Sequence, residues 1–81
     1  MIEWQPGVYR WRQIADDLTR RIDAGDIPPG GLLSENGLMQ EYGVARATVR
    51  RALSELRNRK LIFTRQYLGS FVGQDPEGDN A

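Results

Sequence analysis

Residues 38–56 constrain the fold more than any other part of the chain. Their sequence is LMQEYGVARATVRRALSEL. Leu38 and Tyr42 are four residues apart and therefore share one helical face, and Gly43 can adopt the positive φ of a tight turn between helices. After this turn, apolar residues recur at the spacing of a second helix, at Val49, Ala52, Leu53 and Leu56. Two short helices joined in this way are typical of a helix-turn-helix.

The second of these helices carries its cations away from the apolar stripe. At 100° per residue, Arg46, Arg50 and Arg57 lie within about 40° of one another on one flank. Residues 43–67 contain seven cations and one carboxylate, Glu55, although the whole chain is neutral with 11 basic and 11 acidic residues. The simpler interpretation is a helical hairpin with a solvent-exposed basic face. Such faces, however, usually carry both positive and negative side chains. The local excess therefore predicts a surface for a polyanion.

Composition excludes several other classes of protein. Eighty-one residues form one small domain, and the absence of cysteine and histidine removes disulfides and the usual zinc ligands. We therefore expect no metal and no cofactor. No segment approaches the ~20 apolar residues of a membrane span, so we expect a cytoplasmic protein with no membrane partner. Asp16 and Asp17 are assigned to the exposed side of a helix, and no nucleophile accompanies a base, so an enzyme is not expected.

The N-terminal part of the chain predicts an arm followed by a long helix. Residues 1–7 are predicted to be a flexible arm ending at Pro6-Gly7, and residues 8–24 a helix ended by Gly25. Its predicted apolar face consists of Tyr9, Ile14, Leu18 and Ile22. Trp4 and Trp11 are expected to pack over the core, with a self-association patch as the alternative.

A turn and a short strand are predicted to lead into the helix-turn-helix. Residues 28–31, PPGG, cannot be helical, and Leu32-Leu33 can then form one short strand. Ser34 is a good N-cap for the following helix, with Glu35 in its first turn.

The C-terminal part predicts a β-hairpin and a tail. Residues 61–65 and 70–72 are predicted strands, with Ile62 and Phe71 expected to share a buried face. The turn between them has the size of a wing, and residues 74–81 are predicted to be an acidic, disordered tail. The predicted fold class is α+β, a winged helix-turn-helix over residues 8–73. It has three helices, a two-stranded wing and a short third strand near Leu32-Leu33.

Residues 9–72 resemble the DNA-binding domain of the GntR family of bacterial transcription regulators. The resemblance rests on four blocks in order: YRWRQIADDLTRRIDAGDIPPGGLL, LLSE, YGVARATVRRALSEL and LGSFV. It implies that Arg46, Thr48 and Arg50 meet bases and phosphates, and that the turn of residues 65–69 reaches an adjacent groove. Ser34 and Glu35 match an N-cap pair where a phosphate could dock. The candidate DNA-binding residues are Ser34, Glu35, Asn36, Arg46, Thr48, Arg50, Arg51, Arg65, Gln66, Tyr67 and Gly69.

The chain also departs from the family pattern. Arginine is usual at Asn36 and often found at Leu68, serine or threonine is usual at Ala45, and glycine is usual at Lys60 and Tyr67. Further departures lie at Leu33, Gly37 and Met39. Two cation contacts are therefore lost, a bulky ring stands at the wing tip, and one helix lacks a side-chain cap. We expect a weaker or differently specific DNA binder of modest stability.

The predicted function is sequence-specific binding of double-stranded DNA for transcriptional control, most readily repression. The alternative is a winged-helix module that binds another protein through Tyr67, Leu68, Trp4 and Trp11. The chain is either a stand-alone regulator, favoured by Met1 and the hydrophilic tail, or a fragment of a longer one. No small-molecule effector domain is expected in it. We expect a monomer in solution that forms a homodimer only on DNA.

Overall fold

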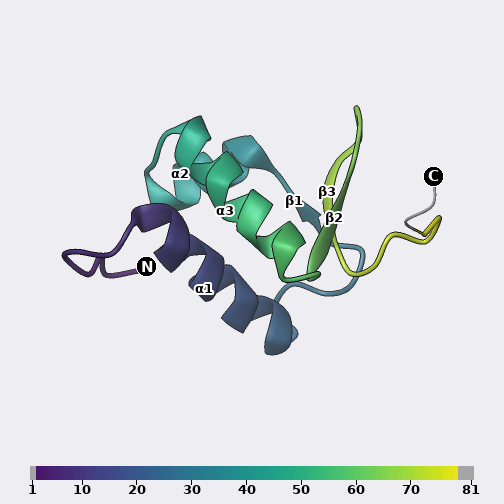
Figure 1. Ribbon diagram of the computed structural model, residues 1–81, viewed down its shortest axis with the longest axis horizontal. Helices are drawn as coiled ribbons and strands as arrows, with labels where there is room; N and C mark the ends of the chain where they lie inside the picture. The colour runs from purple at the N-terminus through teal and green to yellow at the C-terminus, as the bar shows by residue number, and fades with distance from the viewer. Residues whose placement is uncertain (1, 79–81) are drawn as a thin grey trace.

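Three helices and a small sheet make up the computed structural model, which describes residues 2–78 (Figure 1). The elements in order are α1 (Arg10–Asp23), β1 (Leu32–Leu33), α2 (Glu35–Tyr42), α3 (Arg46–Asn58), β2 (Ile62–Arg65) and β3 (Gly69–Val72). In Figure 1 the three helices lie together, and the β2–β3 hairpin projects beside the end of α3. This arrangement confirms the predicted fold class, a winged helix-turn-helix.

The helix boundaries follow local capping chemistry. The hydroxyl of Ser34 accepts a hydrogen bond from the Gly37 amide at 3.1 Å and so caps α2, as predicted. Gly43 ends α2 in the left-handed conformation, with φ of 66°, and confirms the predicted turn. Ala45 precedes α3 without any side-chain cap. The prediction for Tyr9 was wrong: α1 begins at Arg10, and the Tyr9 side chain, just outside the helix, is 75% exposed.

The core lies between α1 and α3. Ile14 and Leu18 of α1 and Val49 and Leu56 of α3 are the largest fully buried side chains. Leu33, Leu38, Tyr42, Ala15, Ala52, Leu53, Ile62 and Val72 complete the core. Among residues 2–78, no helix is long and apolar enough to cross a membrane. Burial of the α3 stripe against α1 leaves the opposite flank of α3 open to solvent.

The sheet places β3 in the centre, with β1 and β2 at its edges. Ile62 pairs with Val72, and both side chains are buried. Phe71 pairs instead with Phe63 on the opposite face, where their ring centroids are 5.6 Å apart. The prediction that Ile62 and Phe71 share a face was therefore wrong. The hairpin turn pairs Arg65 with Gly69, and because side chains alternate along a strand, this register decides which partner faces the core.

Both ends of the described chain contact the domain. Ile2 and Trp4 pack against the core, and the Gln13 side chain accepts from the Gln5 amide at 2.8 Å and donates to the Val8 carbonyl at 2.9 Å. At the other end, the Gln74 amide donates to the Lys60 carbonyl at 2.8 Å. The predicted flexibility of residues 1–7 and disorder of 74–81 stay predictions, and residues 1 and 79–81 lie outside the described chain.

Candidate nucleic-acid interface

The exposed flank of α3 meets the start of α2 through a cluster of charged side chains. Arg46 Nη1 donates to Glu35 Oε1 at 2.7 Å, and Arg46 Nη2 donates to Asn36 Oδ1 at 2.8 Å. One turn further along α3, Arg50 Nε donates to Glu35 Oε2 at 3.0 Å. Each oxygen of the Glu35 carboxylate therefore holds one arginine. Glu35, Asn36, Arg46 and Arg50 are called the recognition cluster below.

The recognition cluster is ordered but accessible. The side chains of Arg46 and Arg50 are 44% and 63% exposed. The hydrogen bonds from Arg50 and Arg46 hold the pKa of Glu35 below its usual range, so this carboxylate is charged at neutral pH. Thr48 lies on the same helix and is partly buried. The arrangement presents two guanidinium groups to solvent in fixed positions.

The other arginines of α3 are directed elsewhere. Arg51 lies over the Trp11 ring of α1, 4.7 Å from its centroid. Arg59 donates to Asp16 at 2.8 Å and to Glu55 at 3.0 Å, and the hydrogen bond to Asp16 raises its pKa. The expected block of uncompensated charge was therefore wrong, because carboxylates distant in sequence pair with several of its cations. The cations placed beside the start of α2 are Arg46 and Arg50.

The wing presents a strongly exposed tip. Tyr67 is 95% exposed and has a φ of 70°, and Gln66 beside it is also exposed. Gly69 has a φ of 119°, a conformation that other residues rarely adopt, so the position favours glycine; a Cβ there would approach only the end of the flexible Leu32 side chain, at 2.9 Å. Arg65 turns away from the tip and forms an ion pair with Asp75. The candidate wing residues are thus divided between the tip and the root of the tail.

Two residues other than glycine have a positive φ in the described chain, Lys60 at 64° and Tyr67 at 70°. Both occupy positions where the resemblance implies glycine. A side chain in this region costs roughly 1–2 kcal/mol relative to the right-handed conformation. The backbone therefore adopts a conformation that favours glycine at both positions, although neither residue is glycine.

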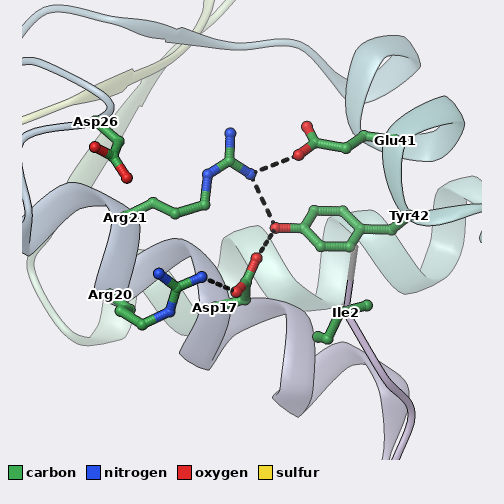
Figure 2. Close-up of a pocket in the computed structure, with 7 residues that line it drawn as sticks. All are labelled: Ile2, Asp17, Arg20, Arg21, Asp26, Glu41 and Tyr42. Carbon is green, nitrogen blue, oxygen red and sulfur yellow. Dashed lines mark hydrogen bonds and ion pairs between the residues drawn. The ribbon is translucent and has the colours of Figure 1, made fainter.

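A second polar cluster lies at the C-terminal end of α2, where Glu41 and Tyr42 meet α1 (Figure 2). The Tyr42 hydroxyl donates to Asp17 Oδ2 at 2.6 Å and accepts from Arg21 Nη1 at 3.1 Å, and the same Arg21 atom donates to Glu41 at 2.8 Å. These four residues are called the rear cluster below. They line a pocket of about 350 Å³ together with Ile2, Arg20 and Asp26.

The rear cluster corrects the expectation that Asp17 lies on the exposed side of α1. Its side chain is only 20% exposed. Burial acts to raise the pKa of Asp17, but hydrogen bonds from Tyr42 and Arg20 outweigh this and lower it. Burial and the hydrogen bond to Asp17 raise the pKa of Tyr42. No periodic pattern in the sequence predicts this contact, because it joins residues 25 positions apart.

The two tryptophans pack as expected and are covered by cations. Trp4 packs against the core and lies 4.8 Å from the Arg10 guanidinium, and Trp11 is covered by Arg51. Of the four apolar anchors expected for a protein partner, Tyr67 and Leu68 are exposed. These two lie at the wing tip.

The helix-turn-helix, the wing and the accessible recognition cluster define a winged-helix domain of the DNA-binding class. Residues 11–72 match the model of the bacterial regulatory proteins of the gntR family. The chain belongs to this family.

Relatives and solved structures agree with this assignment. The chain is 38% identical over 66 residues to the mannosyl-D-glycerate transport/metabolism system repressor MngR of Escherichia coli K12, covering 80% of this chain and 28% of that protein. It is 36% identical over 74 residues to the transcriptional repressor NagR of Bacillus subtilis, covering 90% and 30%. The DNA-binding domain of AraR, crystallised with operator ORR3, superposes with a TM-score of 0.77 at 30% identity, covering 90% and 89%. The chain thus spans less than a third of both repressors.

Proposed function

We propose that this protein binds double-stranded DNA in a sequence-specific manner in the cytoplasm and represses transcription. The observation that carries the proposal is the recognition cluster, in which Glu35 fixes two accessible arginines at the start of α3. In helix-turn-helix proteins, the N-terminal residues of the second helix contact base edges in the major groove. The repressors NagR and MngR and the operator-bound AraR domain support the same function.

The proposed contacts divide into three groups. Arg46 and Arg50 contact base edges, because a guanidinium can donate two parallel hydrogen bonds to guanine O6 and N7. Thr48 contacts a phosphate or a thymine methyl. Ser34, Glu35 and Asn36 hold the start of α2 and orient the arginines, with the α2 N-terminus available to a phosphate.

The wing supplies the remaining contacts. Gln66, Tyr67 and Gly69 form its tip and are proposed to meet the adjacent groove or its sugar-phosphate edge. Arg65 and Arg51 serve as more distant cations, since each has a partner in the structure, Asp75 and Trp11. Exchange of these partners for phosphates accompanies binding in this proposal.

Two copies are proposed to bind together on DNA. A single DNA-binding module buries about 600–1,000 Å², which limits its specificity among the competing sites of a genome. Two copies on a repeated half-site about one helical turn apart would multiply this discrimination. Sedimentation of the free protein should show a monomer at micromolar concentration, and titration of a selected site should show two copies bound. A stable dimer without DNA, or full affinity for one half-site, would overturn this part of the proposal.

Selection of bound duplexes from a random pool tests the proposed function directly. We expect one enriched motif with two half-sites and an affinity that falls linearly with the logarithm of salt concentration. Recovery of no motif, together with no salt-dependent binding to any duplex, would overturn the proposal. A salt-insensitive complex with another protein, lost on Tyr67→Gly, would favour the interaction module instead.

A further inference from the structure

A cleft separates α3 from the wing. It has a volume of about 420 Å³ and is lined by Glu35, Arg50, Leu53, Arg57, Thr64 and Ser70. One wall is α3, which supplies two arginines, and the other is the hairpin, where Thr64 and Ser70 are register partners. The cleft therefore combines cations from one element with hydroxyl groups from another.

Within this cleft, Arg57 is held by a chain of hydroxyl groups. Arg57 Nη1 donates to Thr64 Oγ1 at 2.8 Å, and Thr64 Oγ1 lies 2.8 Å from Ser70 Oγ. Ser70 is buried, so the chain is anchored in the sheet. A guanidinium has five N–H donors, and the hydrogen bond to Thr64 occupies one of them. The remaining donors of a positioned cation are available to an anion.

Glu35, the carboxylate that lines the cleft, pairs with arginines other than Arg57. Glu35 accepts from Arg46 and Arg50. Within residues 2–78, no carboxylate forms an ion pair with Arg57. The Arg57 side chain is exposed. The arginine of α3 that stacks on the Trp11 ring is Arg51. The charge of Arg57 is therefore the least compensated of those that α3 presents toward the wing.

The position of Arg57 along α3 separates it from the bases. Arg50 and Arg57 are seven residues apart, so they face nearly the same direction but lie about 10.5 Å apart along the helix axis. The major groove is about 8.5 Å deep. With the start of α3 at the base edges, Arg57 is displaced from the bases toward the far end of the helix and faces the wing.

We propose that Arg57, positioned by Thr64, binds a backbone phosphate of DNA in this cleft. This inference rests on the proposed function and adds a contact outside the recognition cluster. A charge-assisted, geometrically fixed arginine is well suited to a phosphate. Because phosphates carry no base identity, the contact raises affinity for all duplexes and fixes the orientation of the domain.

Titration of DNA with matched charge variants tests the inference. Wild type, Arg57→Gln and Lys60→Gln are compared on the selected duplex and on a scrambled duplex, between about 0.05 and 0.2 M salt. Both substitutions remove one positive charge, but Lys60 lies beyond the end of α3 and does not line the cleft. Arg57→Gln should weaken binding to both duplexes by about five- to tenfold and reduce the salt slope by about 0.9. Lys60→Gln should behave like wild type.

Thr64→Val separates positioning from charge. It keeps Arg57 but removes its hydrogen-bond acceptor, so affinity should fall by about two- to fivefold on both duplexes. A single neutral methylphosphonate, moved along the selected duplex, should weaken wild-type binding at one phosphate where Arg57→Gln is insensitive. Thermal unfolding of each variant serves as the control that the fold is retained.

The outcomes distinguish this inference from the proposed function. If wild type binds DNA and Arg57→Gln matches Lys60→Gln, the phosphate contact is wrong and the proposed function stands. A loss confined to the selected duplex would make Arg57 a base contact and would also overturn the inference. If wild type binds no duplex in a salt-dependent manner, the proposed function itself fails.

Discussion

The recognition cluster and the rear cluster use the same chemistry at opposite ends of α2. In each, arginine and carboxylate side chains join α2 to a neighbouring helix at 2.7–3.0 Å. They differ in burial. Tyr42, at the centre of the rear cluster, is 8% exposed, whereas the arginines of the recognition cluster are about half exposed.

This difference assigns the two clusters different roles. Exposed ion pairs contribute only about 0–1 kcal/mol to stability, so DNA can replace the partners of Arg46 and Arg50 at little cost. A buried hydroxyl that loses its partner costs about 1–3 kcal/mol, so the rear cluster fixes α2 against α1. The same pairing chemistry therefore holds two helices together at one end of α2 and presents arginines to a ligand at the other.

The largest expected effect concerns DNA binding by the recognition cluster. Arg46→Ala or Arg50→Ala should each weaken binding to the selected site by about 1–3 kcal/mol and binding to random DNA much less, because a bidentate base contact is lost. The free energy of unfolding should change by less than about 0.5 kcal/mol. Parallel titrations and thermal unfolding measure both. Equal losses on both duplexes would identify a phosphate contact, and no loss on either would contradict the assignment of α3.

The next effect concerns stability and the rear cluster. Tyr42→Phe removes the hydroxyl shared by Asp17 and Arg21 and should lower the free energy of unfolding by about 1–2 kcal/mol without changing DNA affinity. Chemical denaturation measures the first quantity and titration the second. Tyr9→Phe is the matched control, since Tyr9 is 75% exposed and its loss of a hydroxyl should have no effect. A change in DNA affinity alone would reverse the roles of the two clusters.

The loss of folding stability at low pH should also distinguish the two clusters, with a smaller effect than Tyr42→Phe. The pKa values of Asp17 and Glu35 are both lowered in the folded protein. Their stabilisation is therefore present above the unfolded values near pH 4 and is lost as pH falls through the folded values. Asp17→Asn should flatten the acid loss of stability more than Glu35→Gln, because Asp17 is less exposed. Denaturation at a series of pH values between about 2 and 6 measures this, and the reverse order would contradict the comparison.

The smallest expected effect lies at the wing tip. Tyr67→Gly relieves the positive φ and should leave the fold intact and DNA affinity unchanged or improved. Lys60→Gly is the control, since it has a similar φ but lies away from the tip. Both variants should unfold at or above the wild-type temperature. The expected result places the Tyr67 ring against the sugar-phosphate edge and outside the groove, and a marked loss of DNA affinity in Tyr67→Gly alone would contradict this placement.

Local sequence patterns predicted most of the fold. Ser34 and Gly43 mark helix ends through interactions within one turn, and the α3 stripe follows from its own period. The faces of Ile62 and Phe71 were not predictable in the same way, because strand register depends on the turn geometry between them. A one-residue difference exchanges the two faces.

The candidate site was predicted in part. Sequence identified Arg46 and Arg50, but the roles of Glu35 and Asn36 as their partners depend on tertiary contacts 10–15 residues apart. Arg57 and Thr64 were not among the candidate residues, because their pairing exists only once the hairpin packs beside α3. Local charge counts could not identify these pairs.

The turn that precedes the two-residue strand β1 links the wing to the rest of the domain. The Gly30 amide donates to the Val72 carbonyl at 2.8 Å, and the Val72 amide donates to the Gly31 carbonyl at 2.9 Å. The base of the hairpin is thus tied to the loop that follows α1, while its tip extends into solvent. Amide protons at Gly30 and Val72 can exchange with solvent only when these bonds break, so their exchange rates should rise and fall together. We therefore expect the base of the wing to keep its position when the tip contacts a ligand, so that any change of conformation is confined to the tip.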